Sequence, residues 1–425
     1  MKVLFASLTQ EGHFNPLTGI AMATKEAGHE VAFYTGNYFA GKLARMGIRH
    51  FPYRRAVEIN AANINEVNPE RLRLSGPRLI RFDARSFFAD NVGNFFDDLT
   101  EIRSEFPYDV LVQDGAVYTQ RLFAEKTEVP TVTVIVIGDM ETDRLVPPLF
   151  FGFQPARGPL DRIKHRAARI ASNQFVMRPG KERYAEILAG YGLEFDRRLV
   201  ITDEPYRYAT SIIQIGTPGF DFPRERTNPK VRHVGALMPW RDPNAKSGAS
   251  VPKGEYRRRA LITQGTIDNE DPNKLMVPAI EGLKDHGLQL VVATGGKGTE
   301  ELRRRFRQDN VVIEDFVDFY DALPETDVYV TNGGLGGVML ALSHGVPVVA
   351  AGINEGKNDV NARLAYRGLG IDLKTQSPTA QAIRSAVERV LADGGLRQRV
   401  EAIRAEFGAH DPLAESVAVI EAAVS

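Results

Sequence analysis

The sequence predicts an α/β protein built from two doubly wound parallel-sheet domains. The chain has 425 residues, which is more than a single hydrophobic core usually supports. Continuous apolar strands alternate with helices in both halves, as in parallel sheets covered on both faces. A stretch at 215–243, dense in proline, glycine and charge, separates the halves as a linker would. Such sheets bind ligands beyond the carboxyl ends of their strands, so we expect one cleft between the two domains.

The first half begins as a strand, helix and strand unit. Asn15 is suited to cap the helix, Pro16 to occupy its first position and Gly28 to end it. Another helix is expected at 119–126, and the phenylalanine-rich segment 59–101 predicts a helical insertion over the sheet. The strands expected in this half lie at 3–8, 30–35, 110–112 and 131–137.

The second half repeats the alternation. Helices are expected at 273–286, 338–344 and 379–392, the last of them amphipathic. The strands expected here lie at 260–263, 289–293, 311–314, 328–331 and 346–350. Polar or glycine-rich loops follow several of these strands, which is where a ligand is expected to bind.

Composition excludes several classes of function. A hydrophobic fraction of 43% with 25% charged residues is ordinary for a globular protein and disfavours disorder. The net charge is -1 and no long basic run occurs, so we expect no nucleic-acid partner. The absence of cysteine excludes disulfides and thiolate metal sites. No apolar run predicts a signal peptide or a membrane span, and we expect a cytoplasmic protein.

The most informative segment is a glycine-rich turn between a strand and a helix. It reads Asn332-Gly333-Gly334-Leu335-Gly336-Gly337. Such a turn offers bare N–H groups and the positive end of a helix dipole to an anion, which predicts a phosphate site. Gln264-Gly265-Thr266 follows a neighbouring strand, and the Thr266 hydroxyl is a candidate donor. The alternative is a tight turn that only packs the helix on the sheet.

Neither known phosphate fingerprint is present in the glycine-rich turn. It lacks the lysine and hydroxyl residue of a P-loop, and it is not the Gly-x-Gly-x-x-Gly dinucleotide motif. No Asp-x-Asp pair occurs, and no group of His, Asp and Glu has metal-ligand spacing. We therefore expect backbone amides to hold the phosphate and no metal to be required.

His13 is the candidate base. We expect it in a loop directly after the first strand, where a neutral imidazole can accept a proton near pH 7. Asp114, at the end of another strand, is suited to accept the other ring N–H and to stabilise the imidazolium. The alternatives are a loop histidine bonded to backbone and an aspartate that caps a helix. A base in one half and a phosphate site in the other predict group transfer across the cleft.

Together these motifs resemble a family. Gly12-His13-x-x-Pro16, Gln264-Gly265-Thr266, Thr331-Asn332-Gly333-Gly334, Gly345-Val346-Pro347 and Asn361-Ala362-Arg363 occur in the order found in nucleotide-sugar-dependent glycosyltransferases of the plant and macrolide types. The resemblance covers essentially the whole chain and implies the GT-B fold. It implies an N-terminal acceptor-binding domain at 1–220, a donor-binding domain at 221–400, and a C-terminal helix within 401–425 that packs on the N-terminal domain.

The resemblance also implies roles for individual residues. His13 is expected to be the base of an inverting transfer, with Asp114 as its partner. Phe316, which by itself would be interpreted as core, is expected to stack on uracil, and the backbone of Val317 to read the base edge. The donor site is expected to comprise Gly12, Gln264, Gly265, Thr266, Phe316, Val317, Asn332, Gly333, Gly334, Leu335, Gly336, Gly337, Glu355, Asn358 and Asp359.

Several donor positions differ from the family pattern. Asn332 stands where the family has a phosphate-binding histidine, and Leu340 where a glutamate holds the ribose. Lys357-Asn358 replaces the Asp-Gln pair that reads the sugar, so Glu355 or Asp359 could recognise the sugar hydroxyls; either could instead be a solvated loop charge. The remaining differences are Gly337 and Val338 in place of serine and threonine, and Phe319 in place of glutamine.

The resemblance implies an enzyme that moves glucose from UDP-glucose, or a close relative, to a hydroxyl of a hydrophobic small molecule, without cofactor or metal, as a monomer or homodimer. The alternatives are a sugar-nucleotide epimerase of the same fold and a catalytically degenerate partner of another transferase. The candidate acceptor wall, which could equally be core, comprises Phe82, Phe87, Phe88, Phe150, Phe151 and Phe153.

Overall fold

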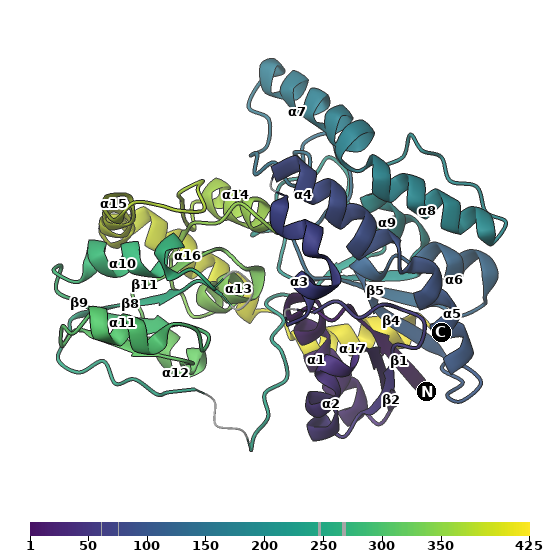
Figure 1. Cartoon of the computed structure of the whole chain (residues 1–425), viewed down its shortest axis with the longest axis horizontal. Helices are drawn as coiled ribbons and strands as arrows, with labels where there is room; N and C mark the ends of the chain where they lie inside the picture. Colours follow the sequence, from purple (N-terminus) through teal and green to yellow (C-terminus); the bar gives the residue numbers. More distant parts are fainter. Residues whose placement is uncertain (61, 75, 245–247, 266–268) are drawn as a thin grey trace.

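The protein, described here from a computed structural model, consists of two α/β lobes (Figure 1). The structure describes residues 1–60, 62–74, 76–244, 248–265 and 269–425. Each lobe is built on its own parallel sheet, and helices cover both sheets (Figure 1). This architecture confirms the predicted fold class. No helix within the described ranges is both long and apolar enough to cross a bilayer.

The N-terminal sheet has seven parallel strands in the order β3-β2-β1-β4-β5-β6-β7. Its strands are β1 (Lys2–Ala6), β2 (Glu30–Thr35), β3 (Arg49–Pro52), β4 (Val110–Asp114), β5 (Thr131–Ile135), β6 (Ser211–Gln214) and β7 (Val231–His233). The last of these lies inside the segment expected to be a linker, so that interpretation was wrong for β7. The chain passes from one sheet to the other between His233 and Arg258.

Helices surround this sheet, and those between β3 and β4 form the expected insertion. The α-helices are α1 (Glu11–Glu26), α2 (Ala40–Met46), α3 (Ile64–Val67), α4 (Gly76–Asp83), α5 (Val92–Ile102), α6 (Gln120–Lys126), α7 (Pro159–Ala171), α8 (Arg178–Gly190) and α9 (Glu204–Tyr208). The other short turns are η1 (Asn37–Phe39), η2 (Pro69–Arg73), η3 (Ala84–Ala89), η4 (Gly115–Val117), η5 (Ser172–Val176) and η6 (Ile201–Asp203). Helix α7 lies at the outer edge of the lobe (Figure 1).

The C-terminal sheet has six parallel strands in the order β10-β9-β8-β11-β12-β13. They are β8 (Arg258–Thr263), β9 (Leu288–Ala293), β10 (Val311–Glu314), β11 (Val328–Thr331), β12 (Val348–Ala350) and β13 (Gly370–Asp372). The helices and turns are η7 (Pro272–Lys274), α10 (Met276–Leu283), α11 (Thr299–Arg305), α12 (Phe319–Ala322), η8 (Leu323–Glu325), α13 (Leu335–Ser343), α14 (Lys357–Arg367), α15 (Ala380–Ala392), α16 (Gly394–Gly408) and α17 (Pro412–Ala422). Helix α17 crosses back to the N-terminal lobe and packs on α1 (Figure 1).

Strand order determines where ligands can bind. In the N-terminal sheet the order reverses between β1 and β4, which pair in parallel with Ala6 opposite Gln113. In the C-terminal sheet it reverses between β8 and β11, with Thr263 opposite Thr331. Loops at such switch points diverge to opposite faces of the sheet and leave a crevice beyond the strand ends. The four strands at these switch points, β1, β4, β8 and β11, are almost entirely buried, so the two crevices are supported by rigid cores.

Candidate active site

His13 lies in the first turn of α1 and not in a loop. The carbonyl of Gln10 accepts hydrogen bonds from the N–H groups of His13 and Phe14, so the helix starts before Asn15. The helix was expected to start at Pro16, but Pro16 is an interior residue of the helix. It lacks the N–H that would bond to the Gly12 carbonyl, but Gly12 is exposed and this carbonyl can be solvated. Gly12 itself faces open space beside His13.

His13 and Asp114 are in direct contact. Nδ1 of His13 lies 2.8 Å from Oδ2 of Asp114, and Asp114 is almost fully buried. Burial lowers the pKa of His13. The charge of Asp114 and the hydrogen bond to it raise the pKa by a larger amount, so the net shift is upward. With Nδ1 donating to the carboxylate, the proton-accepting nitrogen is Nε2. The imidazole is 24% exposed, which leaves room for a substrate hydroxyl to approach.

Asp114 fills both roles that the sequence left open. Its Oδ1 accepts the N–H of Ala116 at 3.3 Å and caps η4, while Oδ2 bonds to His13. At the following Gly115 a β-carbon would lie 2.7 Å from Cδ1 of Ile135, so a side chain there would displace this methyl group. The carboxylate is therefore held by its own turn in the position that fixes the histidine tautomer.

The glycine-rich turn of the other lobe has the geometry of an anion site. Helix α13 begins at Leu335 with Gly334 as its N-cap and with no capping side chain. The first N–H bonded back along the helix is that of Val338, to Gly334, so the N–H groups of Leu335, Gly336 and Gly337 have no intrahelical acceptor. These groups and the helix dipole favour a bound diphosphate.

Two of the glycines are required by close contacts. Gly333 has φ +89°, and a β-carbon there would collide with the Asn361 amide. At Gly337 a β-carbon would lie 2.8 Å from the hydroxyl of Tyr329, whose pKa is raised to about 12 by burial. The tyrosine therefore explains why Gly337 occupies a position where the family has a hydroxyl residue.

Asn332 joins two loops of the C-terminal lobe. It is buried, and its Nδ2 donates a hydrogen bond to the carbonyl of Gln264. The neighbouring Gly265 has φ +80° and leaves space for the Asn332 amide. This amide holds the loop after β11 against Gln264, the residue that follows β8. Thr266, the expected hydroxyl donor, lies outside the described residues.

Phe316 is 58% exposed, so the interpretation as a core residue was wrong. Its ring lies over Gly296, where a β-carbon would be 3.6 Å from the ring. The N–H of Ala249 donates to the Phe316 carbonyl, and the N–H of Asp318 donates to the Ala249 carbonyl. In this parallel bridge the peptide groups of Val317 itself face away from Ala249.

The residues expected to recognise the sugar have different environments. The two oxygens of Asp359 accept the N–H groups of Phe150 and Gly152 at 2.5 and 3.1 Å, and Nδ2 of Asn358 donates to the Phe150 carbonyl at 2.7 Å. Both residues therefore hold a loop of the N-terminal lobe. Glu355 adopts φ +57° and pairs with Nζ of Lys357 at 2.6 Å. It is the more accessible of the two candidate carboxylates.

The six candidate acceptor aromatics are partly buried and divide into two groups. Near α4, Phe88 contacts Tyr118 edge-on, and the Arg71 guanidinium lies over the ring of Phe87. After β5, Phe151 packs on Phe153, which in turn stacks on His165. Phe82 lies on α4 and Phe150 is the residue held by Asp359.

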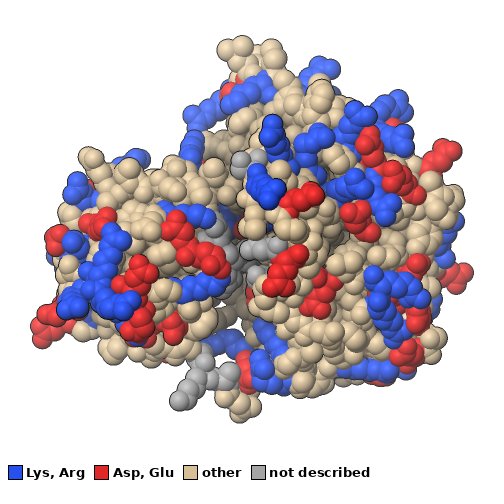
Figure 2. All heavy atoms as spheres, in the orientation of Figure 1, with Lys and Arg blue, Asp and Glu red and all other residues tan. Residues whose placement is uncertain are grey.

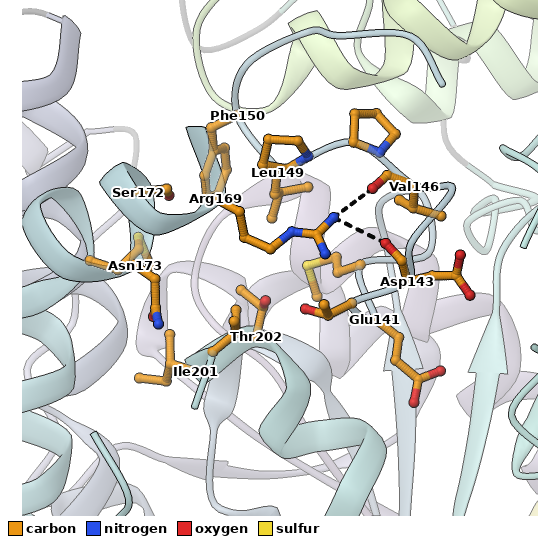
Figure 3. Close-up of a pocket in the computed structure, with 16 residues that line it drawn as sticks. Glu141, Asp143, Val146, Leu149, Phe150, Arg169, Ser172, Asn173, Ile201 and Thr202 are labelled. Carbon is orange, nitrogen blue, oxygen red and sulfur yellow. Dashed lines mark hydrogen bonds between the residues drawn. The ribbon is translucent and has the colours of Figure 1, made fainter. Parts of the chain in front are cut away.

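Phe150 also lines a pocket in the N-terminal lobe (Figure 3). Arg169 crosses this pocket and donates hydrogen bonds to the carbonyls of Asp143 and Val146 at 3.0 and 2.7 Å. The wall is mixed, with Leu149, Ile201 and Met177 alongside Thr202 and other polar groups. Figure 2 shows a separate hollow between the two lobes, on the side where α14 approaches α4.

A buried ion network between the lobes was not predicted. Nε of Arg363 lies 2.6 Å from Oδ1 of Asp221, and Arg224 pairs with Asp139 at 2.7 Å. Burial raises the pKa of Asp139 to about 6, although Arg224 opposes the shift. The Asn361-Ala362-Arg363 motif was the only sequence signal for this network, since its partners lie more than 140 residues away. Among the described residues, no cluster of three potential His, Asp or Glu metal ligands occurs.

Comparisons with known proteins identify the family of the chain. Residues 289–423 match the family described as erythromycin biosynthesis protein CIII-like, C-terminal domain. The chain is 31% identical over 426 residues to 4'-demethylrebeccamycin synthase of Lentzea aerocolonigenes, covering 100% of this chain and 99% of that protein. It is 26% identical to UDP-glycosyltransferase 2 of Phaeomoniella chlamydospora, covering 97% and 93% of the two chains.

Solved structures agree on the fold. The glycotransferase of kitacinnamycin superposes with a TM-score of 0.75 at 17% identity, covering 100% of this chain and 99% of that one. The calicheamicin glycosyltransferase CalG4 gives a TM-score of 0.73 at 19% identity, covering 100% and 98%. The full-length similarity to the synthase assigns the family: this chain belongs to the nucleotide-sugar-dependent glycosyltransferases of natural-product type, which have the GT-B fold.

Proposed function

We propose that the chain transfers a hexose from UDP-glucose, or a closely related nucleotide sugar, to a hydroxyl of a hydrophobic small molecule, with inversion at the anomeric carbon. The observation that carries this proposal is the 2.8 Å contact between Nδ1 of His13 and Oδ2 of Asp114. A histidine held in this tautomer by a buried carboxylate is suited to general-base catalysis.

In the proposed reaction Nε2 of His13 removes the proton from the acceptor hydroxyl. The oxygen attacks the anomeric carbon from the face opposite the diphosphate, and the bond to the diphosphate breaks with its electron pair. Asp114 stabilises the imidazolium that forms. The leaving diphosphate is stabilised by the N–H groups of Leu335, Gly336 and Gly337 and by the α13 dipole. We propose that these groups act in place of a metal ion.

For the nucleotide, the exposed ring of Phe316 and the peptide groups of Val317 support a stacked pyrimidine base. Leu340 supports a second candidate donor, a thymidine diphosphate sugar. The Leu340 side chain cannot accept hydrogen bonds from ribose hydroxyls. A deoxyribose would therefore leave fewer hydroxyls without a hydrogen-bond partner at this position than a ribose would. Solved relatives include VinC in complex with dTDP, and curated relatives include several UDP-glucosyltransferases.

For the sugar, we propose Glu355 as the hydroxyl-binding carboxylate. Both oxygens of Asp359 already accept backbone N–H groups, whereas Glu355 has one short contact, to Lys357. Carboxylates bonded to hydroxyls form charge-assisted bonds, each worth roughly 1.5–3 kcal/mol. The acceptor is proposed to contact aromatic residues of the N-terminal lobe, namely Phe82, Phe87, Phe88, Phe150, Phe151 and Phe153.

The test uses donor hydrolysis and transfer. Purified protein is screened by thermal shift against UDP-glucose, dTDP-glucose and their relatives, because a ligand at 100 times its Kd stabilises by about 2.7 kcal/mol. The best donor is then incubated with a panel of apolar acceptors, and NMR reports the anomeric configuration of the product. His13→Ala is expected to bind the donor normally and to lose roughly 10²–10⁴-fold in turnover.

Four outcomes would contradict the proposal. Turnover by His13→Ala equal to that of the wild type would show that His13 is not the base. Retention of configuration would exclude a single inverting displacement. A donor that binds but is neither hydrolysed nor transferred would favour a degenerate partner protein, and an altered sugar still attached to its nucleotide would favour an epimerase.

A further inference from the structure

Helix α7 (Pro159–Ala171) has its polar face turned towards the protein. Its inward side carries Asp161, His165 and Arg169; His165 is 7% exposed and stacks on Phe153. The apolar side chains face solvent: Leu160 is 82% exposed, Ile163 65% and Ile170 53%. A surface helix of a globular protein normally has the opposite arrangement, with the apolar stripe on the core.

The exposed side chains form one continuous stripe. Leu160, Ile163 and Ile170, together with the exposed Ala167, follow a helical repeat that keeps them on one face. Phe175, in the turn η5 after the helix, extends the stripe and is 65% exposed. Because α7 lies at the outer edge of the N-terminal lobe, no other described element covers this face (Figure 1).

Positive charge borders the stripe. Between residues 157 and 178 the only acidic residue is Asp161, against six basic ones. Arg162 and Arg166 lie on one side of the stripe and Lys164 on the other, all of them exposed. In Figure 2 the same end of the molecule has tan side chains bordered by Lys and Arg. The chain as a whole has a net charge of -1, so this is a local concentration of cations.

The apolar stripe and the cations beside it together limit which kind of partner can cover this face of α7. A symmetric dimer through α7 would bring two copies of the same cationic surface together, which is unfavourable. The stripe is also a convex ridge only one helix wide. A fluid lipid surface can adapt to such a ridge without a preformed groove. An exposed apolar stripe flanked by Lys and Arg is the pattern of helices that lie in the membrane interface.

We propose that α7 and Phe175 dock the protein on the surface of a bilayer that contains anionic phospholipids. Leu160, Ile163 and Ile170 enter the boundary between head groups and acyl chains, and the flanking cations contact lipid phosphates. Arg169, on the inward face of the same helix, lines the pocket of Figure 3, so docking brings that pocket next to the bilayer. The inference does not depend on the transfer reaction.

Co-sedimentation with vesicles tests the proposal. The full chain is mixed with vesicles of phosphatidylcholine alone and of phosphatidylcholine with phosphatidylglycerol in equal parts. We expect sedimentation with the anionic vesicles, weakened by salt. The double variant Ile163→Glu/Ile170→Glu is expected to stay in solution. Both sites are more than half exposed, so its melting temperature should match that of the wild type.

Two further variants make the test specific. Arg162→Gln/Arg166→Gln is expected to weaken binding to the anionic vesicles about 25-fold, at about fivefold for each cation near the surface. Val424→Glu, at an exposed apolar residue beside the C-terminus and away from α7, is the matched control and should bind as the wild type does (Figure 1).

Two results would overturn the proposal. The first is the absence of sedimentation with either vesicle, or equal sedimentation of the wild type and the Ile163→Glu/Ile170→Glu variant. The second is a lipid-free dimer that this variant abolishes, which would assign the face to a second copy of the chain.

Discussion

Replacing Asp114 by asparagine should inactivate the enzyme without unfolding it. The carboxylate has two partners, the N–H of Ala116 on Oδ1 and Nδ1–H of His13 on Oδ2. The asparagine oxygen can keep only one of them. If it caps η4, the amide NH₂ faces His13 and favours the tautomer with the proton on Nε2, which cannot then accept the acceptor proton.

The magnitude depends on the assistance that is lost. General-base catalysis contributes roughly 10²–10⁴-fold, so turnover by Asp114→Asn should fall by about this factor. The pKa of His13 should fall as well, because the charge and hydrogen bond that raise it are gone and the lowering effect of burial remains. A base works when it is neutral, so activity rises with pH through the His13 pKa. The residual activity of Asp114→Asn should therefore begin its rise at lower pH.

Initial rates across a pH series, together with thermal melts, measure both effects. Loss of the His13 contact alone should leave the melting temperature close to that of the wild type, because the cap to Ala116 is retained. A large drop in melting temperature with normal turnover would mean that Asp114 serves only as a cap. Reduced turnover with an unshifted pH profile would show that Asp114 does not set the pKa of His13.

The remaining predictions concern the C-terminal lobe and the ion network. Phe316→Ala should keep its melting temperature but weaken UDP binding by about 1–3 kcal/mol in calorimetry; equal affinity would exclude stacking. Activity should survive EDTA, and a loss restored by magnesium would contradict phosphate binding by amides alone. Gly337→Ser should destabilise by about 1–3 kcal/mol through contact with the Tyr329 hydroxyl, and less so in a Tyr329→Phe background, as a double-mutant cycle can measure. The pKa of Asp139 is raised to about 6, so its stabilising contribution is present below about pH 4 and lost as pH rises through 6. As the pH rises over that range, the melting temperature of Asp139→Asn should therefore increase relative to that of the wild type. A difference in melting temperature that stays constant with pH would show that Asp139 does not titrate there.

The contact between His13 and Asp114 could be predicted because it depends only on strand order. Asp114 ends β4 and His13 follows β1, and the carboxyl ends of these two directly paired strands share one edge of the parallel sheet. The start of α1 could not be predicted in the same way. Pro16 favours the first turn by local propensity, but the carbonyl of Gln10 starts the helix earlier.

The contacts of the C-terminal lobe were harder to predict because its polar side chains form hydrogen bonds with residues far away in the sequence. Asn332 was expected to face phosphate, and its amide reaches the Gln264 carbonyl, 68 residues earlier. The close contact of Gly337 with Tyr329 likewise depends on packing of a helix against a strand. Sequence spacing identifies which residue types follow a strand, but it does not reveal which backbone groups they will meet.

Asp359 was expected in the donor site but has a structural role that links the two lobes. Phe150 adopts φ +70°, which is unfavourable for a residue with a side chain, and Asp359 and Asn358 hold it there through both its N–H and its carbonyl. With the N–H of Gly152, three hydrogen bonds link this loop of the N-terminal lobe to the start of α14 in the other lobe. Any opening of the cleft must either break all three bonds or carry the loop along with α14. Because losing the partners of a buried carboxylate is costly, the loop should move with α14, so that this part of the N-terminal lobe travels with the C-terminal lobe.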